Sequence, residues 1–120
     1  MGGVFIMDNP LYKKGEAMTF DKENMKTAEK LRSGQTCLVQ GFGQSMTPIL
    51  KSGQVCKVEP VTETTKLAKK DIVLCKVNGH VYLHKITAIK GERYQISNNH
   101  KHVNGWTGRN NIFGVVTEIL

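Results

Sequence analysis

The sequence predicts a mainly β domain preceded by one short helix. After Gly34, short apolar segments alternate with glycine-containing and polar turns, which is typical of antiparallel strands. Asn78-Gly79 joins two such segments and is the strongest hairpin signal in the chain. Because a chain of 120 residues has room for one modest core, we expect a single β domain over residues 35–120.

The first 20 residues predict an irregular N-terminal arm. They contain glycine, Asn9-Pro10 and no sustained apolar period. Their apolar run, Val4-Phe5-Ile6-Met7, is far shorter than the roughly 20 residues of a membrane span, and no cleavage-site pattern follows it. We therefore expect a soluble protein without a membrane anchor. The three cysteines, an odd number without Cys-x-x-Cys spacing, favour a reducing location in the cytoplasm.

Residues 21–34 predict the helix. Asp21 suits the N-cap, and the basic Lys30 and Arg32 suit the last turn before Ser33-Gly34. The thin apolar stripe consists of Met25, Ala28 and Leu31. Because so few apolar side chains lie on one face, we expect this helix to pack lightly on the β domain.

The strands are predicted from short apolar segments bounded by turn residues. They are Thr36–Gln40, Gln54–Val58, Asp71–Val77, Val81–Ile89, Tyr94–Ser97 and Ile112–Ile119. The charged stretch 62–70 and the polar stretch 98–111 are read as surface loops. Trp106, within the second loop, is either a core residue or an exposed binding aromatic.

The composition argues against several classes of function. The net charge is +7, but the lysines are scattered and no aromatic residues alternate with them, so we do not expect nucleic acid as a partner. The three cysteines show no Cys-x-x-Cys spacing, so neither a disulfide framework nor a zinc site is indicated. His100 and His102 lack acidic or cysteine partners at usable spacing and are read as surface residues. We expect no metal and no other cofactor.

A glycine-rich turn presents a candidate nucleophile. Gly41 and Gly43 let the backbone bend sharply before Ser45, and Pro48 stiffens the exit from the turn. A serine hydroxyl is a poor nucleophile at neutral pH unless a base lies within hydrogen-bond reach. The best candidate for that base is His84.

Six motifs in order resemble the successive conserved boxes of the superfamily that contains signal peptidase I and the LexA-type repressor peptidases. They are Gln44-Ser45-Met46-Thr47-Pro48, Ser52-Gly53-Gln54-Val55, Lys70-Asp71-Ile72-Val73, Leu83-His84-Lys85-Ile86, Ile96-Ser97-Asn98-Asn99 and Phe113-Gly114-Val115-Val116. The resemblance covers about residues 35–120. It implies a signal-peptidase-like β fold of open, barrel-like antiparallel sheets.

The resemblance also implies a set of site residues. Bacterial signal peptidases and LexA-type proteins use a lysine as general base where this chain has His84, whereas the archaeal and endoplasmic-reticulum enzymes use a histidine. Asn98 stands where the Ser-His branch has an aspartate that orients the histidine, and is expected to take that role here. The expected oxyanion and substrate-binding residues are Gly43, Gln44, Met46, Pro48 and Tyr82.

Strand alternation favours His84 over Lys85 as the base. Side chains alternate between the faces of a strand, so His84 should share a face with Tyr82 and Ile86 while Lys85 points the other way. A slip of one residue in register would exchange the two. A histidine base predicts that activity is lost below about pH 6.5.

Two functions remain open at this point. The first is a soluble serine endopeptidase that cleaves an extended peptide, in trans or in its own arm, through a Ser45/His84 dyad. The alternative is a catalytically weak or inactive module for peptide binding or homodimerisation, because the usual Gly-Asp boxes read Gly53-Gln54 and Ser97-Asn98. The Ala-Gly or Cys-Gly dipeptide at which LexA-type proteins cut themselves is absent from the arm. Either function suits a regulator encoded by a phage or mobile element.

Overall fold

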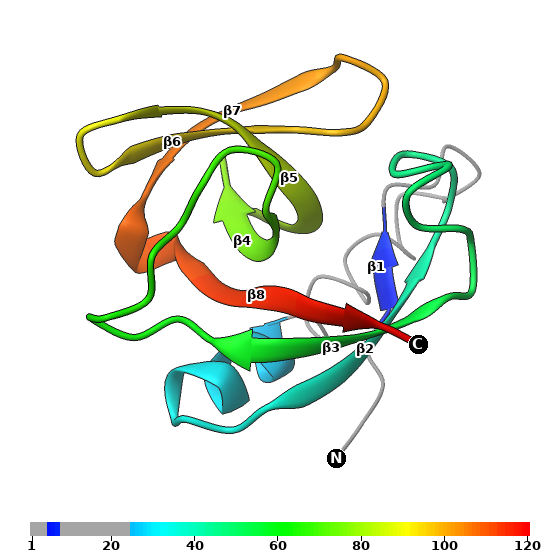
Figure 1. Ribbon diagram of the computed structural model, residues 1–120, viewed down its shortest axis with the longest axis horizontal. Coiled ribbons are helices and arrows are strands. Elements are labelled where there is room, and N and C mark those ends of the chain that lie inside the picture. Colours follow the sequence, from blue (N-terminus) through cyan, green and yellow to red (C-terminus); the bar gives the residue numbers. More distant parts are fainter. Residues whose placement is uncertain (1–4, 8–24) are drawn as a thin grey trace.

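The structure, a computed structural model, describes residues 5–7 and 25–120 (Figure 1). Within these residues, eight strands form one sheet in the order β1-β2-β3-β8-β4-β5-β6-β7. The strands are β1 Phe5–Met7, β2 Cys37–Phe42, β3 Val55–Pro60, β4 Ile72–Val77, β5 His80–Lys90, β6 Arg93–Ser97, β7 Val103–Gly108 and β8 Ile112–Ile119. A single 3-10 turn, η1 Arg109–Asn111, lies between β7 and β8. The predicted mainly β fold with one short helix is confirmed.

The last strand joins the two halves of the sheet. β2 and β3 pair antiparallel in one half, and β4, β5, β6 and β7 form an antiparallel meander in the other. β8 inserts between β3 and β4 and pairs antiparallel with both. Figure 1 shows β8 running from the β4–β7 half of the molecule to the side of β3.

The N-terminal arm contributes a strand, contrary to the prediction that residues 1–20 are irregular. Phe5–Met7 pairs parallel with the end of β2, with Ile6 opposite Gly41. This strand forms because its backbone pairs with β2. Three residues are too few to show an alternating pattern, so the sequence alone does not predict it. The rest of the predicted arm, and the first residues of the predicted helix, lie outside the described residues.

Residues 25–32 form the described part of the helix. Ala28 and Leu31 are buried, and Met25 is partly buried against the same core, as the thin apolar stripe predicts. The helix ends at Gly34, whose φ of +96° suits a residue without a Cβ atom. The Gln35 N–H then donates to the Lys30 carbonyl at 3.0 Å, which completes a Schellman-type cap.

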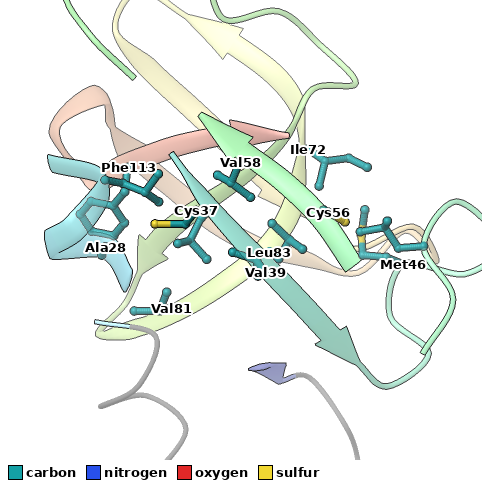
Figure 2. Close-up of a cluster of buried hydrophobic side chains, with 13 residues drawn as sticks. Ala28, Cys37, Val39, Met46, Cys56, Val58, Ile72, Val81, Leu83 and Phe113 are labelled. Atoms are coloured by element: carbon teal, nitrogen blue, oxygen red, sulfur yellow. The ribbon is translucent and has the colours of Figure 1, made fainter. Parts of the chain in front are cut away.

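Two apolar clusters fill the two faces of the curved sheet. β4 is buried on both faces, since Leu74 belongs to the first cluster and Val73 and Cys75 belong to the second. Figure 2 shows the first cluster, which extends from Ala28 and Phe113 at one end to Met46 at the other. The serine turn is therefore anchored in the same core as the helix.

Most predicted strands are confirmed to within two residues at their ends, but β7 was missed. The predicted loop 98–111 contains β7 and η1. Asn104, Gly105 and Gly108 are turn and loop formers, so this edge strand lacks the apolar alternation that marks a strand. Trp106 within it is 39% exposed, which settles its position as a surface residue. The hairpin at Asn78-Gly79 is confirmed, with positive φ at both residues, as a type I′ turn requires.

No helix in the described part of the chain is long and apolar enough to cross a membrane. The three cysteines, Cys37, Cys56 and Cys75, are buried as free thiols.

Candidate active site

A closed turn after β2 carries Ser45. Gly43 has a φ of +110°, which is the bend that the glycine-rich sequence predicts. Two hydrogen bonds close the base of this turn: the Gly41 N–H donates to Gln54 O at 3.2 Å, and the Gly53 N–H donates to Gly41 O at 2.6 Å. The Thr47–Pro48 peptide bond within it is cis. The turn thus returns to the strand it left, and Ser45 lies within it.

The structure places His84 beside Ser45. Nε2 of His84 lies 3.2 Å from Oγ of Ser45, although the residues are 39 positions apart in the chain. His84 is on β5 and is fully buried, whereas Ser45 is half-buried. A partly exposed hydroxyl therefore contacts an imidazole that is shielded from solvent.

Asn104 and Tyr82 hold the imidazole of His84. Oδ1 of Asn104 lies 2.6 Å from Nδ1 of His84, and the Tyr82 ring stacks on the imidazole with centroids 4.9 Å apart. Because an amide oxygen only accepts hydrogen bonds, Nδ1 carries the proton and Nε2 presents its lone pair to the Ser45 hydroxyl. That tautomer is the one a general base requires.

The prediction that Asn98 orients His84 is wrong. Oδ1 of Asn98 instead accepts hydrogen bonds from the backbone N–H groups of His100 at 2.7 Å and His102 at 3.0 Å. Asn98 therefore shapes the loop between β6 and β7. Asn104, six residues later on β7, is the asparagine that contacts the imidazole of His84.

Lys85 bonds to a side chain of the loop between β6 and β7, whereas His84 contacts the Ser45 hydroxyl. Nζ of Lys85 donates to Oδ1 of Asn99 at 2.8 Å. Leu83, also expected on the face opposite His84, packs in the first apolar cluster, whereas Ile86 packs in the second. The register of β5 thus gives His84, and not Lys85, to Ser45.

The other predicted site residues lie on or beside the turn, in different settings. The Gly43 N–H donates to Oγ of Ser52 at 3.1 Å, and the Gln44 carbonyl accepts from the Thr47 N–H at 3.2 Å. Met46 is buried in the first core cluster, and Pro48 is exposed. Tyr82 stacks on the imidazole of His84.

A small pocket adjoins Ser45. Two glycines, apolar side chains and Lys51 line it: Gly41, Gly43, Met46, Leu50, Lys51 and Leu83. Among the described residues, no acceptor lies on the Ser45 N–H. That N–H is therefore available to an oxygen of a bound carbonyl group, which is the chemistry of an oxyanion hole.

His100 is exposed, as predicted, and its ring also contacts the serine turn. Its Nε2 lies 2.8 Å from Gln44 O and 3.1 Å from Oγ1 of Thr47. His102 is exposed. Within residues 5–7 and 25–120, no group of three or more His, Cys, Asp or Glu side chains is placed to hold a metal ion.

Sequence reasoning missed Asn104. The Asn104-Gly105 pair is a strong turn signal, and Gly105 does have a φ of +143°. Val103 and Gly105 nevertheless pair with Ser97 and Ile96 of β6, and Asn104 is the extra residue of a β-bulge between these two pairs. Its side chain contacts His84 of β5. Only a correct prediction of β7 and its register could have identified this residue.

Comparison with protein families gives a match to the family model described as peptidase S24-like, over residues 6–117. The match covers nearly the whole chain. The mainly β sheet agrees with this family's LexA-like and signal-peptidase-like fold, and the resemblance drawn from the six motifs is confirmed. A search of curated proteins finds no match.

Proposed function

Because the chain belongs to the peptidase S24-like family, we propose that it is a serine endopeptidase with Ser45 as nucleophile and His84 as general base. The observation that carries this proposal is the contact of 3.2 Å between Oγ of Ser45 and Nε2 of His84. The hydrogen bond of Asn104 to the other ring nitrogen supports the same assignment. A buried histidine held between a hydroxyl and an amide oxygen suits proton transfer.

The chemistry is acyl transfer to serine. Nε2 of His84 takes the hydroxyl proton while Oγ of Ser45 bonds to the substrate carbonyl carbon. The Ser45 N–H stabilises the oxyanion that forms. The tetrahedral intermediate collapses, the C–N bond breaks, and His84 gives its proton to the leaving amine. Water, deprotonated by His84, then hydrolyses the acyl-enzyme and releases Ser45.

The substrate is an extended peptide with a small side chain next to the cleaved bond. The pocket beside Ser45 is small, with a volume of about 20 Å³, and Leu50 and Leu83 form part of its wall. An extended peptide gains affinity by backbone pairing, and pockets of this kind select alternate side chains. The segment Phe5–Met7 pairs with the end of β2 just before the serine turn, which supports the chain's own N-terminal region as one substrate.

The test is N-terminal peptide profiling of cells that express the wild-type chain, Ser45→Ala or His84→Ala, with this protein's own peptides included. New termini in the wild type that vanish in both variants would support a peptidase and would identify its substrate. Ser33→Ala and His102→Ala are matched controls, because both residues are exposed and away from the dyad. These controls should give the wild-type pattern.

The competing function is a peptidase-fold module that binds peptides or forms homodimers without cleavage. Identical termini in wild type and Ser45→Ala at matched expression would favour it. Labelling of the purified protein with a fluorophosphonate probe separates the two further. A Ser45 adduct that requires His84 is expected only if the serine is activated.

A further inference from the structure

The loop between β6 and β7 forms hydrogen bonds with the carbonyl groups of the serine turn. The Asn99 N–H donates to Ser45 O at 2.7 Å, and Nδ2 of Asn99 donates to Thr47 O at 2.8 Å. Nε2 of His100 lies 2.8 Å from Gln44 O. Three of the four carbonyls from residue 44 to residue 47 are therefore held from one loop. The turn's orientation depends on that loop.

The loop itself is fixed by Asn98. Oδ1 of Asn98 accepts the N–H groups of His100 and His102, and its own N–H donates to His102 O at 2.9 Å. Lys101 adopts a φ of +68° at the tip. Asn99 and His100 are thus presented to the serine turn from a closed backbone ring.

Lys85 fixes the side chain of Asn99. Its ammonium group donates to Oδ1 of Asn99 at 2.8 Å, a charge-assisted hydrogen bond. With the oxygen held by Lys85, the amide presents only its Nδ2 donor to Thr47 O. Lys85 follows His84 directly on β5, and both lie in the antiparallel ladder with β4. Two consecutive residues of β5 therefore act on the serine turn: His84 contacts the Ser45 hydroxyl, and Lys85 supports the turn through Asn99.

We propose that Asn99 and Lys85 are positioning residues for Ser45. Their hydrogen bonds fix the turn so that Oγ of Ser45 stays at 3.2 Å from His84 and the Ser45 N–H faces the substrate carbonyl. This inference rests on the proposed function, because it concerns the rate at which Ser45 reacts. A misplacement of about 1 Å in a nucleophile can cost about 100-fold in rate.

The test is the rate at which a fluorophosphonate probe acylates Ser45 in the purified full chain, followed by intact mass over a range of probe concentrations and pH. Asn99→Ala and Lys85→Met should lower the maximal rate about 10- to 100-fold with little change in probe affinity. The pH dependence should keep its wild-type shape, because His84 and Asn104 are untouched. Lys85→Arg should restore most of the rate, since a guanidinium also donates to Oδ1 of Asn99.

Lys90→Met is the matched control, because Lys90 is exposed at the end of the same strand. Thermal unfolding of each variant measures folding separately from reactivity. If the wild-type chain reacts at Ser45, and Asn99→Ala and Lys85→Met both react as fast as the wild type, the positioning role is overturned while the proposed function stands. Equal rate losses in Lys85→Met and Lys85→Arg, together with lowered melting temperatures, would show a structural role and overturn it as well. A wild-type chain that forms no Ser45 adduct would overturn the proposed function itself and this inference with it.

Discussion

The carboxamide oxygen of Asn104 lies 2.6 Å from Nδ1 of His84, and the hydroxyl of Ser45 lies 3.2 Å from Nε2 of the same ring. The three residues form one hydrogen-bonded line from β7 through β5 to the serine turn. An amide at its end selects the tautomer of the imidazole but adds no negative charge. The line therefore differs from a triad that ends in a carboxylate.

Substitutions of Asn104 should separate the effect of fixing the imidazole tautomer from the effect of a negative charge beside the ring. We expect Asn104→Ala to lower the rate of Ser45 acylation by the fluorophosphonate probe about 10- to 100-fold, because the ring loses the partner that fixes its tautomer. Asn104→Asp should react at least as fast as wild type, since a carboxylate also stabilises the imidazolium. Intact-mass kinetics measure both rates. An Asn104→Ala protein that is acylated as fast as wild type would contradict the role given to Asn104.

Gly114 leaves no room for a side chain in the sheet. A Cβ atom there would lie 2.5 Å from Cγ1 of Val58 and 3.0 Å from both the Glu59 carbonyl oxygen and Cδ1 of Leu31. We expect Gly114→Ala to lower the free energy of unfolding by about 1–3 kcal/mol, because the added methyl group overpacks this junction of β3, β8 and the helix. Thermal or urea unfolding measures the change.

Gly108→Ala is the control for that experiment. The nearest atom to an added Cβ there is Nη1 of Arg93 at 3.9 Å, and Gly108 has a φ of −86°, which other residues adopt. We expect no loss of stability, and a small gain through the less flexible unfolded chain. A Gly114→Ala protein as stable as Gly108→Ala would show that β8 can move away from its neighbours.

The buried thiols predict a loss of stability in alkali. Burial raises the pKa of the Cys56 thiol from 9.0 to about 11, and raises the pKa of Cys75 as well. A folded-state pKa above the unfolded value stabilises the fold fully below about pH 9, and this contribution is lost as the pH rises through about 11. Urea unfolding at several pH values should give a shallower fall over this window for Cys56→Ala than for wild type. Equal slopes would contradict the prediction.

The sequence predicted those parts of the molecule whose signals are local. The apolar segments, the Asn78-Gly79 turn and the Ser33-Gly34 helix end all specify their backbone within a few residues. Ser45 and His84 were paired by the order of motifs and by the alternation of side chains on β5. The structure brings them together through contacts that link residues 39 positions apart.

What the sequence did not predict depends on neighbours in space. β1 has three residues and takes its order from β2, and β7 contains an Asn-Gly pair that would mark a turn elsewhere. Asn104 could not be placed beside His84 without that strand. Asn98 was misassigned for the same reason, because a motif gives a residue's order in the chain and not the direction of its side chain.

Because β8 lies in the centre of the sheet, the site can assemble only after this strand has been synthesised. Ser45 belongs to the half of the sheet built on β2 and β3, and His84 to the half built on β4 to β7. β8 is the strand that bonds these halves together, and it is made after the other described strands. Pairings this distant in sequence form late in folding, because the loop they close is long. A nascent chain that has not yet released β8 holds Ser45 and His84 on two unjoined sheets, so the contact between them forms only after β8 has been made.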